Sequence, residues 1–90
     1  MSNLILSEAM VLATEYLSRH DFLFSKEYTL DFSVSSGSLS IGLTILHRGH
    51  WISYSVYVSA SQLYASSSPR SIVIYACDRM IDNLWQEMEY

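Results

Sequence analysis

Three consecutive segments, residues 28–34, 39–45 and 52–58, alternate apolar and polar side chains, and short turn-forming stretches separate them. Such alternation is typical of strands with one buried face. If Ser36-Gly37 and Arg48-Gly49 are two-residue hairpin turns, the apolar residues form four cross-strand rows on one face. The rows are Val34, Leu39 and Val58; Phe32, Ile41 and Val56; Leu30, Leu43 and Tyr54; and Tyr28, Ile45 and Ile52. A slip of one residue would destroy this agreement, so the pattern predicts a three-stranded antiparallel meander.

A helix is predicted before the strands. It begins with Ser7 as its N-cap and with Leu6 placed to pack against Val11, or earlier with Asn3 as the cap. We expect it to end at His20-Asp21. Its expected buried stripe consists of Ala9, Met10, Ala13, Tyr16 and Leu17. Phe22, Leu23 and Phe24 follow as an apolar segment that we expect to pack under the sheet.

A second helix is predicted after the strands. Proline at the first helical position, preceded by serine, marks its start at Ser68-Pro69. Its apolar stripe consists of Val73, Ala76, Cys77, Met80, Ile81, Leu84 and Met88. A fourth strand at residues 72–75 is the alternative, because β-branched residues favour strands, but the helical period continues well beyond it. We interpret Ser59 to Ser68 as a loop with at most one helical turn.

The predicted fold is therefore α+β, in the order α-β-β-β-α, with the meander covered on one face by two helices and residues 1–90 forming one domain. Phe32 lies near the centre of the apolar face. The opposite face is expected to be wet, unless the segment 59–68 covers it. Its rows are Ser33, Ser40 and Tyr57; Asp31, Gly42 and Ser55; Thr29, Thr44 and Ser53; and Glu27, Leu46 and Trp51.

Charged residues are scarce in this chain. They make up 16% of it, against about 25% in an average soluble protein, and seventeen serines supply much of the polar surface. The net charge is −4, and only five residues are Lys or Arg. So few cations cannot form the phosphate-neutralising patch that nucleic acids require. We therefore expect no direct binding of nucleic acid.

Cys77 is the only cysteine, so neither a disulfide within the chain nor a site of several thiolates is possible. The first residues carry no basic region before an apolar stretch, and no segment approaches the roughly 18 apolar residues of a membrane span. We expect a cytoplasmic protein without a cofactor. Because Cys77 falls on the apolar stripe of its helix, we interpret it as a structural thiol rather than a nucleophile.

Trp51 and Leu46 are predicted to pair across the second hairpin on the polar face, near Arg48 in the turn and with Tyr57 farther along the strand. Trp, Tyr and Arg are the residues most enriched at binding hot spots. A protein-binding site is one interpretation of these four residues. The alternatives are cross-strand packing that stabilises the hairpin, and cover by the segment 59–68.

His47 and His50 flank the second turn and are expected to face each other. Two imidazoles do not make a stable metal site without a third ligand, and none is evident in the sequence. On the last helix, Asp78, Asp82, Glu87 and Glu89 make an acidic side. Most such faces are only solvated. The functional alternative is that Asp78 and Asp82 help to occupy a basic groove of a partner protein.

The order helix, three strands, helix resembles the double-stranded RNA-binding domain over most of the chain. That family binds phosphates with a lysine-rich start of its second helix, where this chain has Ser68-Pro69-Arg70-Ser71 and a single cation. The absence of those lysines argues against RNA binding, and domains of that family can also serve as protein-binding modules. Element order, size and acidity are also similar to those of several phage-encoded inhibitors of bacterial defence, including some anti-CRISPR proteins.

Together these features predict a small non-enzymatic protein-binding module of the inhibitor or immunity type, which blocks a larger complex. The alternative is self-association into a homodimer through the sheet face or a strand edge, because neither outer strand contains proline. A small enzyme that uses His47 or His50 is the third and weakest hypothesis.

Overall fold

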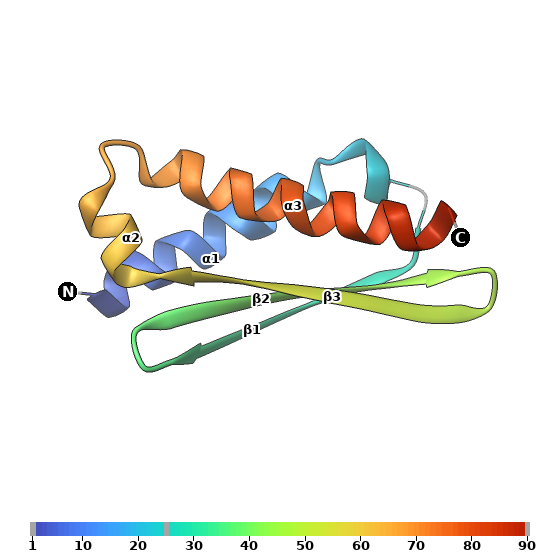
Figure 1. Ribbon diagram of the computed structural model, residues 1–90, viewed down its shortest axis with the longest axis horizontal. Coiled ribbons are helices and arrows are strands. Elements are labelled where there is room, and N and C mark those ends of the chain that lie inside the picture. The colour runs from blue at the N-terminus through green and yellow to red at the C-terminus, as the bar shows by residue number, and fades with distance from the viewer. Residues whose placement is uncertain (1, 25, 90) are drawn as a thin grey trace.

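The computed structural model describes residues 2–24 and 26–89 (Figure 1). Its elements are, in chain order, α1 (Ser2–Ser18), the 3-10 helix η1 (Asp21–Leu23), β1 (Tyr28–Ser35), β2 (Ser38–His47), β3 (His50–Ser59), α2 (Ala60–Ala65) and α3 (Pro69–Glu89). The three strands form one antiparallel sheet in the order β1-β2-β3. All helices lie on the same side of this sheet, which confirms the predicted α+β meander with helices on one face.

The register of the sheet is the one predicted from the sequence. Phe32 pairs with Ile41, and Ile41 pairs with Val56 on its other side; the remaining rows follow in step. Both connections are two-residue turns in which each residue has a positive φ: 52° at Ser36, 76° at Gly37, 54° at Arg48 and 81° at Gly49. These values are typical of the type I′ turn, whose twist matches that of the flanking strands.

The hydrophobic core is centred on β2, whose inward side chains are completely buried: Leu39, Ile41, Leu43 and Ile45. The helical stripes predicted for α1 and α3 face these residues. Cover decreases toward both outer strands, because Leu30 and Phe32 of β1 and Tyr54 and Val56 of β3 are only half-buried. Val34, which we expected in the first apolar row, is 49% exposed at the end of β1.

The start of α1 differs from the prediction. The helix begins at Ser2, so neither Ser7 nor Asn3 is its N-cap. Leu6 is buried one turn before Ala9, and its burial extends the helical stripe toward the N-terminus. Val11 is 58% exposed, so the expected contact between Leu6 and Val11 is wrong. Packing of this stripe against the core stabilises the helix.

The end of α1 and the segment after it also differ in part. The helix ends at Ser18, and His20 instead caps η1, where its Nδ1 accepts a hydrogen bond from the backbone N–H of Phe22. Leu23 is buried and Phe22 packs against the core, as expected. Phe24 is 89% exposed and takes no part in the apolar segment under the sheet. The tight turn of η1 directs Leu23 inward and leaves Phe24 outside.

The chain after β3 forms the short helix α2 instead of a loop. Ser59 caps it, with its hydroxyl accepting from the N–H of Gln62 while the Gln62 side chain accepts from the N–H of Ser59. Helix α2 packs on the helical side, where Leu63 is buried, so the segment 59–68 leaves the far face of the sheet open. Helix α3 begins at Pro69 as predicted and includes residues 72–75, so the alternative fourth strand is wrong.

Candidate functional site

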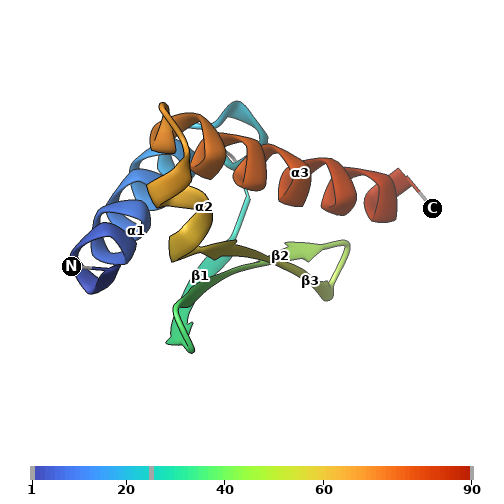
Figure 2. The same ribbon diagram turned by 60° about the vertical axis from the view of Figure 1, so that its left-hand side comes forward.

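No helix of the described residues covers the sheet face that points away from α1, α2 and α3 (Figure 2). Its side chains come from alternate positions of the three strands, as the register requires. Serine, threonine and Gly42 occupy the middle of the face, and Asp31 is the only charged residue of the strands on it. The two aromatic residues of the face lie on β3.

Trp51 and Tyr57 lie at opposite ends of this face. Trp51 is 56% exposed and pairs with Leu46 next to the second turn, and Tyr57 is 72% exposed and pairs with Ser40. The two aromatic residues are six positions apart along the strand, a span of about 20 Å. Arg48 is exposed in the turn beyond Trp51. The structure thus places Leu46, Arg48 and Trp51 together at one end, and Tyr57 away from them at the other.

A shallow depression of about 490 Å³ lies between the two aromatic ends. It is lined by residues of all three strands, with Gly42 at its centre and Asp31 on the β1 side. A Cβ added at Gly42 would meet only Asp31, at 3.7 Å, which is an ordinary van der Waals distance. The fold therefore does not require glycine at this position. The absence of a side chain there deepens the depression in the middle of the face.

A second surface feature involves two residues that the sequence analysis did not single out. Tyr75 is 55% exposed on α3, and the guanidinium of Arg79, one turn later, lies 5.9 Å from the centre of its ring. Both line a groove of about 410 Å³ between the first turns of α3, the end of β3 and α2, which Tyr57 lines from the strand and Gln62 from α2. The spacing of four between a tyrosine and an arginine was the only sequence signal for this pair.

The two acidic candidates on α3 have different environments. The Asp78 carboxylate accepts a hydrogen bond from the Tyr16 hydroxyl at 2.5 Å and thereby links α3 to α1. This hydrogen bond, together with burial and the charge of Asp78, raises the pKa of Tyr16 to about 12. Asp82 is exposed. Asp78 thus serves the contact between the helices, and neither residue lies on the open sheet face.

The histidine pair and the cysteine have the positions expected from the sequence. His47 and His50 are opposite each other in the register, with His50 exposed and Nε2 of His47 buried without a hydrogen-bond partner. Residues 2–24 and 26–89 contain no group of three or more His, Cys, Asp or Glu residues that could hold a metal ion. Cys77 is fully buried, and burial, followed by the charge of Asp78, raises the pKa of its thiol to about 12.

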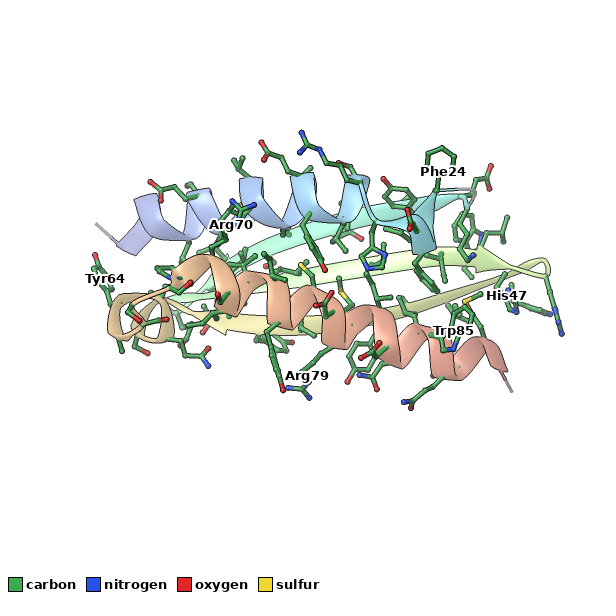
Figure 3. All side chains as sticks on the ribbon, turned by 90° about the horizontal axis from the view of Figure 1, so that it is seen from above. Phe24, His47, Tyr64, Arg70, Arg79 and Trp85 are labelled. Atoms are coloured by element: carbon green, nitrogen blue, oxygen red, sulfur yellow. The ribbon has the colours of Figure 1, made fainter. Side chains whose placement is uncertain are left out.

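A further aromatic cluster lies at the end of the molecule where α3 approaches η1 (Figure 3). The rings of Phe22 and Trp85 meet edge to face, with their centroids 5.9 Å apart, and the Lys26 ammonium lies 4.9 Å from the centre of the Phe22 ring. Trp85 is 51% exposed. Because each of these rings has a partner within the chain, we interpret the cluster as packing that closes the end of the core.

Neither protein-family models, nor curated proteins, nor solved structures give a match to this chain. The helices of the described residues are all too short or too polar to cross a membrane. The described elements follow the order on which the resemblance to the double-stranded RNA-binding domain rests, with α2 added before the last helix. The start of α3 carries Arg70 as its only cation within the first turn.

Proposed function

We propose that this chain is a small non-enzymatic protein-binding module that contacts its partner through the open sheet face. The observation that carries the proposal is the exposure of Trp51 and Tyr57 on a face that no helix covers in the described chain. The other side chains of this face are small and weakly charged. Large aromatic side chains among them can bury much apolar area against a partner at little cost in desolvation of charged groups. Leu46 and Arg48 extend the contact at the Trp51 end.

The proposal includes a role of the inhibitor or immunity type, in which occupying a surface of a larger complex is itself the function. Such a role requires one rigid contact face and no reacting groups. The sheet supports it because β2 is anchored by a fully buried row, so the aromatic side chains of β3 are presented from a rigid base. A preorganised face loses little conformational entropy on binding.

The test is affinity capture from native lysate, followed by native mass spectrometry of the recovered complex. We expect a stoichiometric complex with the wild type, and at least about tenfold weaker binding when Trp51→Ala and Tyr57→Ala are combined. Tyr64→Ala is the matched control, because Tyr64 is similarly exposed at 54% but lies on α2, on the helical side. Circular dichroism must show that both variants keep the fold. Equal capture by the double variant would refute the assignment of the face.

Self-association through the same face is the second candidate function. The middle of the face is uncharged on β2 and β3, so two copies that stack through these two strands place no like charges opposite each other there. Light scattering over a hundredfold range of concentration distinguishes the two candidates. A dimer that dissociates on the change Trp51→Ala supports stacking, and a monomer mass throughout removes it.

A further inference from the structure

The outer edge of β3 is an unprotected strand edge. In the second hairpin His47 and His50 flank a two-residue turn, and such flanking residues form a hydrogen-bonded pair. Hydrogen bonding then alternates along β3, and the bond from the Ala60 N–H to the Gly37 carbonyl continues the same alternation beyond the strand. Consequently Ser53, Ser55 and Tyr57 direct their N–H and C=O groups away from β2, toward the edge.

The β3 strand itself lacks the sequence features that usually prevent strand addition. From Trp51 to Ser59 the strand contains no proline and no charged residue, and its pairing with β2 continues without a bulge. Natural edge strands are commonly blocked by one of these features. The other edge strand, β1, carries Asp31 in its middle. The β3 edge is therefore the better template for a further strand.

Helix α3 turns this edge into a groove. It packs mainly on β3, and Figure 3 shows it crossing the strand obliquely, so that its later turns lie beyond the β3 edge. The groove of about 410 Å³ lies at the Tyr57 end of β3, between this end of the strand, α2 and the first turns of α3, and its apolar lining includes Val58, Ile72 and Ala76. Tyr54 and Val56, on the same side of β3, are half-buried and would be covered by an added strand.

The charge of the groove indicates the chemistry of its occupant. Among the described residues that line it, Arg79 is the only charged one. Its guanidinium lies over the Tyr75 ring and keeps its hydrogen-bond donors available to a carboxylate at the rim. An occupant that carries an acidic side chain opposite Arg79 is therefore favoured over a basic one.

We infer that the β3 edge and α3 together bind an extended segment of a partner protein, which adds as a fourth strand and places an acidic side chain against Arg79. This inference rests on the proposed function as a protein-binding module and names the form of the partner's contact. A single strand brings no helix of its own to this edge. A second copy of this chain would bring its own α3 into the same space, which disfavours pairing of two β3 edges.

The experiment uses two capped octapeptides of alternating threonine and valine, in which one central threonine is replaced by glutamate in the first peptide and by lysine in the second. Each is titrated into the 15N-labelled protein. We expect the amide signals of Ser53, Ser55 and Tyr57 to shift and to become protected from hydrogen exchange, with the glutamate peptide bound about tenfold more tightly. The variant Arg79→Glu should reverse this preference, and it alters an exposed side chain that the fold does not need.

A second pair of variants tests the backbone contact. Ser55→Pro removes an N–H that points to the outer edge and leaves the bonds to β2 in place, whereas Ser55→Thr keeps the N–H. We expect peptide binding to fall at least about tenfold in the first and to change less than about twofold in the second. Shifts confined to Asp31, Gly42 and Thr44, equal affinity for the two peptides, or no binding at millimolar concentration would each overturn the inference.

The same variants separate this inference from the proposed function. If the wild type captures a partner from lysate and Ser55→Pro captures it equally well, binding through the open face stands and strand addition is wrong. If the wild type captures no partner but the peptides bind as expected, the edge groove stands and the open face loses its assigned role.

Discussion

The Tyr16 hydroxyl in α1 and the Asp78 carboxylate in α3 form a hydrogen bond of 2.5 Å across the interface of the two long helices. Apolar side chains of α1 and α3 belong to the same core, and this directional polar contact fixes the rotation of one helix against the other. A hydrogen bond to a charged acceptor is stronger than a neutral one, although partial exposure of the pair reduces its net contribution.

Tyr16→Phe should lower the free energy of unfolding by about 1 kcal/mol, measured by urea denaturation at pH 7. The pKa of Tyr16 is raised to about 12 in the folded chain, above the value of about 10 for an unfolded tyrosine. The stabilisation is therefore fully present below pH 10 and is lost as the pH rises toward 12. In the Tyr16→Phe variant, the unfolding free energy should therefore decrease less between pH 10 and pH 12 than it does in the wild type. An unchanged alkaline profile in that variant would contradict the assignment.

Cys77 should resist alkylation in the folded protein. The thiol is completely buried and its pKa is raised to about 12, so both access and thiolate formation are suppressed. At pH 8, iodoacetamide should label the native chain only through unfolding, whereas the chain in concentrated urea should be labelled within minutes. Intact-mass spectrometry follows the reaction. Rapid labelling of the native chain would show that the middle of α3 opens locally, and would make the interpretation of Cys77 as a purely structural thiol untenable.

Leu30 and Leu43 pair across β1 and β2 in one row, but their burial differs: Leu43 is completely buried and Leu30 is only half-buried. Leu43→Ala should cost about 3 kcal/mol in unfolding free energy, because it leaves a cavity at the centre of the core. Leu30→Ala should cost about 1.5 kcal/mol, because less apolar area is lost. Equal losses, measured by urea denaturation, would mean that α1 covers β1 as fully as β2.

The sequence predicted the sheet register correctly because both of its determinants are local. Period-two alternation assigns each side chain to a face, and two-residue turns fix the pairing. Burial across the sheet could not be predicted in this way. Phe32, expected near the centre of the apolar face, is only half-buried, since β1 is an edge strand that α1 contacts only weakly while α3 packs mainly on β3 at the opposite edge.

The candidate site was predictable only in part, because tertiary packing, unlike the sheet register, is not set by local sequence patterns. Trp51 and Tyr57 follow from the register, because position in the alternation decides their face. The groove beside Tyr75 and Arg79 depends on the angle at which α3 crosses β3, and no local pattern encodes that angle. The bond between Tyr16 and Asp78 likewise joins residues 62 positions apart.

The two hairpin turns store strain that a substitution should release. Ser36 and Arg48 have φ values of 52° and 54°, a region that is costly for most L-residues but accessible to asparagine. Ser36→Asn should therefore raise the unfolding free energy by about 0.5 kcal/mol, measured by thermal and urea denaturation. Ser35→Asn, one residue earlier in the extended strand, is the control and should give no gain. A similar gain in both variants would point to an effect of composition rather than of turn geometry.

Gly42 links the stability of the sheet to the shape of its open face. Glycine within a strand costs backbone entropy, and a Cβ at this position would meet Asp31 only at an ordinary 3.7 Å. Gly42→Ala should therefore raise the unfolding free energy by about 0.5 kcal/mol.

The same methyl group partly fills the depression between Trp51 and Tyr57, so capture of a partner through this face should weaken even though the fold is more stable. Urea denaturation measures the stability, and the capture assay measures partner binding. Weaker capture together with lower stability would contradict the prediction, because the loss of binding would then follow from the weaker fold. Ser67→Ala is the control for the capture assay, because Ser67 is exposed in the segment between α2 and α3, outside the sheet, and should change neither quantity.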